Sequence, residues 1–137
     1  MIVHKASNVE GIRVEKFPYK GVMREVTGVT LRWLSKRGTD AAGNPAYGLR
    51  HFTVAPGGSI PAHAHYYLQT VYIESGEFEC LSYDPDTDEV VETCLCGPGQ
   101  SVFVDFNEPH GMRNTSTTEP ATFLCCVCSL GDGEVSL

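Results

Sequence analysis

Apolar and polar residues alternate in short runs along most of the chain, and Gly, Pro, Asn and Asp separate these runs at close intervals. A period of two residues is typical of β-strands that bury one face, and we find no long stretch with a helical period. The runs expected to form strands are 22–26, 30–34, 48–55, 69–74, 78–83, 90–96, 101–104, 111–114 and 121–129. Many short strands in a chain of this length predict an all-β sandwich or barrel.

The length and the absence of internal divisions indicate one domain. The chain has 137 residues, and it contains no linker, low-complexity tract or repeat that would separate two units. A domain of this size buries enough surface to form a core without disulfides. We therefore expect a single domain over residues 1–137.

The charge balance excludes some classes of partner. There are 10 basic and 17 acidic residues, for a formal net charge of −7. This excess of negative charge argues against binding to nucleic acid or to an anionic membrane surface. No apolar run approaches the roughly 18 residues of a transmembrane helix, and the first residues lack the pattern of a signal peptide. We expect a cytoplasmic protein.

The six cysteines are many for a cytoplasmic protein of this size. They are Cys80, Cys94, Cys96, Cys125, Cys126 and Cys128. Strand geometry places Cys94 with Cys96, and Cys126 with Cys128, on one face of their strands. We interpret the cysteines as apolar core residues. A second metal site made of thiolates, and a redox disulfide such as Cys80 with Cys94 across a hairpin, remain alternatives.

Three of the five histidines form the most informative pattern. His63 and His65 are two residues apart, so an extended strand presents both imidazoles on one face, with Gln69 on the same parity. A third histidine from a distant strand would complete a facial set of metal ligands and leave coordination positions open. His110 is the candidate for this third ligand, and Gln69 is the candidate for a fourth.

The spacing around these histidines resembles the two motifs of the cupin superfamily. The first motif corresponds to Gly57, His63, His65, Gln69 and Gly76, and the second to Gly99, Asp105, Asn107, His110 and Asn114. Three positions depart from the usual residues: Gln69 replaces Glu, Asp105 replaces Pro and Asn107 replaces Gly. The resemblance covers about residues 30–129 and implies a jelly-roll β-barrel, commonly dimeric, with a metal inside. By its motif position, Asn114 is expected to fasten backbone.

The segment 1–29 lies largely outside the resemblance. We interpret it as an N-terminal extension whose exposed strands pair with a second subunit, which would give a homodimer.

Glutamine in place of glutamate changes the expected chemistry. Three neutral imidazoles and an amide give the metal no negative protein ligand, so the site would suit a small chelating anion such as an enolate, a hydroxy acid or a thiolate. Alternatively, Gln69 only hydrogen-bonds a metal-bound water, or the site has decayed and binds metal weakly. The donor set fits one divalent metal ion, Fe, Mn, Zn or Ni, without choosing among them. Candidate substrate-binding residues are Arg50, Phe52, Tyr67 and Met112.

The function expected from this site is that of an oxidoreductase, a metal-dependent dioxygenase acting on a small anionic substrate, or that of a related lyase or isomerase. The sequence offers no protein general base beside the ligands, which disfavours hydrolysis and proton transfer. Two alternatives remain: a non-catalytic, metal-dependent module that binds a small molecule, and a structural dimer module with the metal as a staple. A fold alone does not choose among them.

Overall fold

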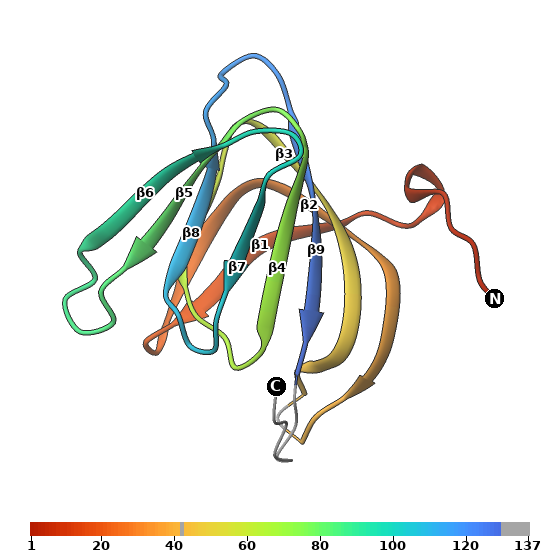
Figure 1. Ribbon diagram of the computed structural model, residues 1–137, viewed down its shortest axis with the longest axis horizontal. Coiled ribbons are helices and arrows are strands. Elements are labelled where there is room, and N and C mark those ends of the chain that lie inside the picture. Colours follow the sequence, from red (N-terminus) through yellow and green to blue (C-terminus); the bar gives the residue numbers. More distant parts are fainter. Residues whose placement is uncertain (42, 130–137) are drawn as a thin grey trace.

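A computed structural model describes residues 1–41 and 43–129 as a single curved sheet that wraps into a barrel (Figure 1). In this part of the chain the sheet has nine strands. They are β1 (Ile12–Tyr19), β2 (Val22–Thr39), β3 (Pro45–His63), β4 (Leu68–Ser75), β5 (Phe78–Tyr83), β6 (Val90–Cys96), β7 (Ser101–Val104), β8 (His110–Asn114) and β9 (Ala121–Cys128). A 3-10 helix, η1 (Ala6–Asn8), precedes β1, and no helix among the described residues could cross a membrane.

The strand order follows the path β6-β5-β8-β3-β9-β4-β7, and β2 pairs with both β1 and β3. The long strand β3 holds the two halves of the barrel together. Its first part pairs with β2 and β9, and its last part, from Ser59 to His63, pairs with β8. The all-β jelly-roll barrel expected from the sequence is confirmed.

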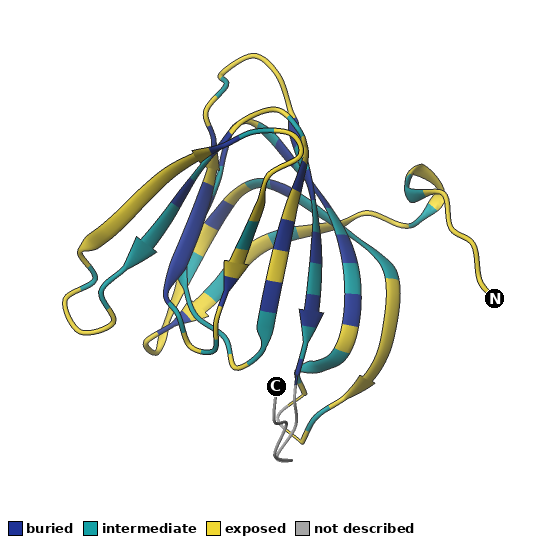
Figure 2. Cartoon of the chain, in the orientation of Figure 1, coloured by how far each residue is buried: buried dark blue, intermediate teal, exposed yellow. Residues whose placement is uncertain are grey.

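The core lies inside the barrel and follows the two-residue period. Along β4 and β9, buried residues alternate with more exposed ones, as Figure 2 shows. Ile73, Phe78, Cys125 and Val127 are all fully enclosed, and the rings of Phe52 and Phe123 stack with centroids 4.7 Å apart. Burial of these side chains is the main stabilising contribution.

Most of the expected strands are present, and β5, β6 and β7 have the expected bounds. The runs 22–26 and 30–34 belong to one strand, β2. The pairing of β2 with β3 shifts register between Thr27 and Val29, and Gly28 adopts the positive φ (+66°) at this point. The run 48–55 is part of β3, which continues to His63.

Strand β1 was not predicted. Its apolar residues are Ile12, Val14, Phe17 and Tyr19, and a register shift between Val14 and Lys16 interrupts their alternation. The step from Val14 to Lys16 on β1 pairs with a step of four residues on β2, from Val29 to Glu25, and beyond it the more buried residues are Phe17 and Tyr19. Strand β1 forms a hairpin with β2 within the same chain. The pairing of segment 1–29 with a second subunit stays a prediction.

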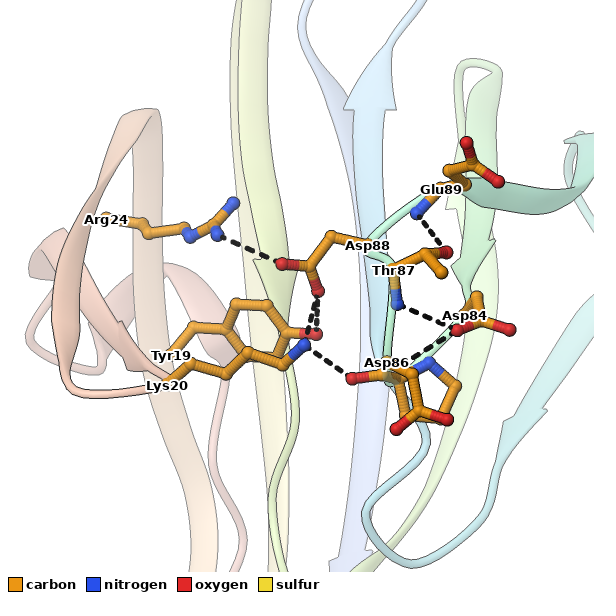
Figure 3. Close-up of polar contacts among 9 residues, drawn as sticks. Tyr19, Lys20, Arg24, Asp84, Asp86, Thr87, Asp88 and Glu89 are labelled. Carbon is orange, nitrogen blue, oxygen red and sulfur yellow. Dashed lines mark hydrogen bonds and ion pairs between the residues drawn. The ribbon is translucent and has the colours of Figure 1, made fainter.

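A polar cluster ties the β1–β2 hairpin to the β5–β6 connection (Figure 3). Asp88 accepts hydrogen bonds from the Tyr19 hydroxyl and from Lys20 Nζ, each at 2.8 Å. Arg24 approaches the same carboxylate at 3.9 Å, and Lys20 Nζ also donates to the Pro85 carbonyl. Exposed ion pairs contribute little to stability singly. Together, these contacts hold the β1–β2 hairpin against the β5–β6 connection.

Replacing Gly76 by alanine is expected to lower the free energy of unfolding by about 2–4 kcal/mol. Gly76 has φ +75°, and an added Cβ would lie 2.5 Å from Ala121 Cβ. Gly57 is a matched control, because its φ is +69° with no atom within 4 Å of the added Cβ. Gly57→Ala should cost about 1 kcal/mol. Denaturant unfolding measures both, and equal losses would contradict the packing argument.

Candidate metal centre

Three imidazoles converge inside the barrel where β3 and β8 meet. His63 ends β3, His110 begins β8 directly opposite it, and His65 follows in the connection to β4. One ring nitrogen from each histidine lies within 4.8 Å of the other two. This group has the geometry to hold one metal ion.

An irregularity in β3 turns His63 inward. Ile60 and His63 both line the inner cavity, although residues three apart lie on opposite faces of a regular strand. The pairing of β3 with β8 shifts register between these two residues. The parity of His63 and His65 in an extended strand is therefore not what brings them together, since His65 lies beyond the end of β3.

Backbone carbonyls set the tautomer of all three rings. Nδ1 donates to the Pro61 carbonyl in His63 (3.0 Å), to the Tyr67 carbonyl in His65 (3.2 Å) and to the Glu108 carbonyl in His110 (2.8 Å). A carbonyl only accepts, so the proton is on Nδ1 and the lone pair is on Nε2. Three neutral Nε2 donors suit a divalent transition metal ion.

Burial keeps the three rings neutral. Desolvation, followed by the neighbouring His110, lowers the pKa of His63 to about 3, and the same causes lower the pKa of His65 to about 4. Desolvation also lowers the pKa of His110. The lone pairs of His63 and His65 are therefore available to a metal ion well below neutral pH.

The metal-free protein is expected to lose stability as the pH falls from about 6.5 to 4. An unfolded histidine binds a proton near pH 6.5, whereas folded His63 and His65 bind one only near pH 3 to 4. Because the unfolded chain then carries more protons, the free energy of unfolding decreases by up to about 1.4 kcal/mol per pH unit and per histidine. Urea unfolding across this range measures the slope, and His65→Gln should reduce it; a slope unchanged in that variant would contradict the assignment.

Two observations show that these residues fit a metal ion. His65 Nε2 is buried and has no hydrogen-bond partner among the described residues, a state that costs free energy unless another group binds it. The inner cavity, which His63 and His110 line, has a volume of about 20 Å³, which is room for one water-sized group. A metal bound by the three Nε2 atoms would satisfy all of them.

Gln69 is buried beside the histidines, and Arg50 sets its orientation. Arg50 Nη2 donates to Gln69 Oε1 at 3.3 Å, and Gln69 Nε2 lies 3.4 Å from His110 Nε2. Arginine cannot accept a hydrogen bond, so the amide oxygen must face it and the amide nitrogen faces His110. To ligate a metal through Oε1, Gln69 would have to turn away from Arg50. Its role as fourth ligand stays a prediction.

The four candidate substrate-binding residues all line this cavity. They are Arg50, Phe52, Tyr67 and Met112. The Tyr67 ring stacks on His65 with centroids 3.8 Å apart. Their contact with a substrate stays a prediction.

Sequence reasoning missed Phe17. Its ring stacks on His63 with centroids 4.7 Å apart, and it closes one wall of the cavity. The apolar residues of segment 12–19 indicate a strand, but their alternation changes phase after Val14, where the register with β2 shifts.

Asn114 has the structural role expected from its motif position. Its Nδ2 donates to the carbonyls of Val54, Ala55 and Glu119 at 2.8–3.2 Å, and its Oδ1 accepts from Ser116 N. It therefore fastens β3 to the loop that follows β8. The other two histidines, His4 and His51, lie outside the cavity.

The fold and site define a class: a jelly-roll barrel with a three-histidine group capable of binding a metal ion. The sequence model of the cupin domain family (Cupin_2) matches residues 50–127. The chain therefore belongs to the cupin domain family.

Solved structures agree with this fold. Polyketide cyclase RemF from Streptomyces resistomycificus is 24% identical, with a TM-score of 0.64 over 99% of this chain and 87% of that chain. A predicted oxalate decarboxylase from Thermotoga maritima is 21% identical, with a TM-score of 0.67 over 94% and 100% of the two chains. An RmlC-like cupin from Shewanella frigidimarina is 15% identical, with a TM-score of 0.65 over 92% and 88%. No curated protein sequence matches the chain. These identities support the fold alone.

Proposed function

We propose that the protein is a mononuclear metal dioxygenase that binds a small chelating anion between a divalent metal ion and Arg50. The histidines 63, 65 and 110 would hold the metal, and Arg50 would pair with the negative charge of the substrate. The observation that carries the proposal is the buried, uncompensated charge of Arg50.

Arg50 is only 8% exposed, yet no ion pair joins it to a carboxylate within residues 1–41 and 43–129. Its Nη2 donates to Gln69 Oε1 and to Cys125 Sγ at 3.0 Å, and its Nε has no partner among the described residues. The rings of Trp33, Phe52 and Tyr67 surround the guanidinium, with centroids 5.1–6.0 Å from it. Aromatic faces compensate a buried cation only in part, so an anion beside Arg50 would be stabilised. Because the cavity has room for one water-sized group, side chains of its wall would have to move to admit the anion.

The lining of the cavity supports redox chemistry over hydrolysis. No Asp or Glu is among the described residues that line it, so a carboxylate base to activate water is lacking there. An iron or manganese ion would supply Lewis acidity and electron transfer to dioxygen. Arg50 would orient the anion, Gln69 Nε2 would donate a hydrogen bond toward the ligand, and the rings of Phe17 and Phe52 would exclude water.

The test is to prepare metal-free protein, to add one equivalent of Fe(II), Mn(II), Zn(II) or Ni(II), and to measure dioxygen uptake. Diketones, hydroxy acids and thiols would serve as trial substrates, and calorimetry would record their binding. We expect dioxygen uptake with iron or manganese, and anion binding without uptake for zinc. Anion binding with no uptake for any metal would overturn the dioxygenase proposal in favour of a binding module.

A further inference from the structure

A second cavity lies between the two ends of the strand path. Among the described residues, β6 pairs with β5 and β7 pairs with β4, and no hydrogen bond joins β6 to β7. The opening between them has a volume of about 300 Å³ and reaches His110 and Met112. Figure 2 shows β6 exposed along nearly its whole length.

Three thiols face this opening. Cys94 and Cys96 project into it from β6, and their Sγ atoms lie 3.9 Å apart. Cys80 projects from β5, directly opposite Cys94 and diagonal to Cys96. All three are free cysteines, and Cys94 is exposed although it is on the inner face, because the barrel is open here.

The spacing of the two sulfurs matches metal coordination better than a disulfide. Two thiolates bound to one tetrahedral zinc ion at about 2.3 Å lie about 3.8 Å apart. A disulfide needs about 2.05 Å, and cysteines two apart on one strand are at the limit of its Cα range. Glu92 is the next residue on the same face of β6 and adds a carboxylate at the opening.

We propose that Cys94 and Cys96, joined by Cys80 after a rotation of its side chain, form a second metal site for a thiophilic divalent cation such as Zn²⁺ or Cd²⁺. Glu92 and Glu108 at the opening, together with the net charge of −7, attract a cation. Each thiol that binds releases one proton to solvent, without oxidation. Burial raises the pKa of Cys80 to about 12, so the metal ion would have to displace the proton of this thiol.

The proposed thiol ligands take no part in the proposed dioxygenase site, although the opening that they line also reaches His110 and Met112. Arg50, Tyr67 and Phe17 do not line this opening. The test of the thiol site therefore needs no substrate.

The experiment is a Cd²⁺ titration of fully reduced protein, which follows thiolate-to-cadmium charge-transfer absorption in the ultraviolet and the number of bound ions. We expect two ions per wild-type chain, one of them with thiolate absorption. His63→Ala should bind one ion with unchanged thiolate absorption, because only the histidine site is lost. Cys94→Ser should lose the absorption and bind the thiolate-site ion at least tenfold more weakly; since Cys94 is exposed, this change should leave the fold intact by circular dichroism.

The second Cys-x-Cys pair provides a matched control. Cys126 and Cys128 have the same spacing on β9 but do not line the opening, so Cys126→Ser should leave the titration unchanged. Thiolate absorption that survives Cys94→Ser, or that is absent from the wild type, would overturn the site. So would a disulfide between Cys80 and Cys94 in unreduced protein, identified by peptide mapping of the linked cysteines.

Discussion

Replacing His63 or His110 by alanine is expected to abolish stoichiometric metal binding, with a loss of affinity of at least about 100-fold. Each variant removes one of three neutral Nε2 donors that lie within 4.8 Å of one another. The two histidines that remain cannot compensate for the missing donor, because hydrogen bonds from Nδ1 to backbone carbonyls fix the orientation of their rings. The measurement is elemental analysis of protein purified without chelator, in moles of metal per chain.

His51→Ala is the control for this experiment. His51 is also partly buried on β3, but its Nε2 pairs with Glu74 at 3.1 Å, outside the cavity. We expect this variant to retain the metal. If His63→Ala and His110→Ala both keep the wild-type metal content while the barrel stays folded, the three-histidine site is wrong.

Replacing Arg50 by methionine is expected to weaken the binding of a chelating anion about 10- to 100-fold, while the metal is retained. A hydrogen bond to a charged group contributes about 1.5–3 kcal/mol, and the guanidinium is the cation that lines the cavity. Methionine fills a similar apolar volume, so the barrel should remain folded. The change also frees Gln69 Oε1 to turn toward the histidines, so metal affinity should be equal or higher. Calorimetry with oxalate as the probe anion measures the first effect, and a metal titration measures the second.

Two further variants make the Arg50 result specific. Arg50→Lys keeps the positive charge but loses the planar guanidinium, which can donate two parallel hydrogen bonds to a carboxylate. The affinity of this variant for oxalate should therefore lie between those of the wild type and Arg50→Met. Arg32→Met is the matched control, because Arg32 Nε is also buried without a partner among the described residues, but Arg32 does not line the cavity. Equal oxalate affinity in Arg50→Met and the wild type would show that Arg50 does not contact the anion.

Local spacing was enough to predict the fold and the histidines. The alternation of apolar residues determines strands, and the glycines at 57, 76 and 99 all have positive φ, as turns between strands require. The two motifs then identify His63, His65 and His110, which the structure brings together. These features depend on residues close together in the chain, so they can be seen in the sequence.

The surroundings of the site depend on contacts that no local pattern records. The spacing of Gln69 and His65 predicts that both lie on one face of a strand. Whether the oxygen or the nitrogen of the Gln69 amide faces His110 depends on Arg50, which is 19 residues away in the sequence. Phe17 reaches His63 only because the hairpin of β1 and β2 folds over the barrel within the same chain.

The sequence by itself determined the family of this protein, its all-β architecture and its three nitrogen donors, because these follow from strand periodicity and motif spacing. Only the tertiary structure decided the inward turn of His63, the uncompensated charge of Arg50 and the convergence of Cys80 with Cys94 and Cys96 at the opening of the barrel. Each of these depends on strand register and on the desolvation of groups far apart in the chain. Both are set only when the sheet closes around its core.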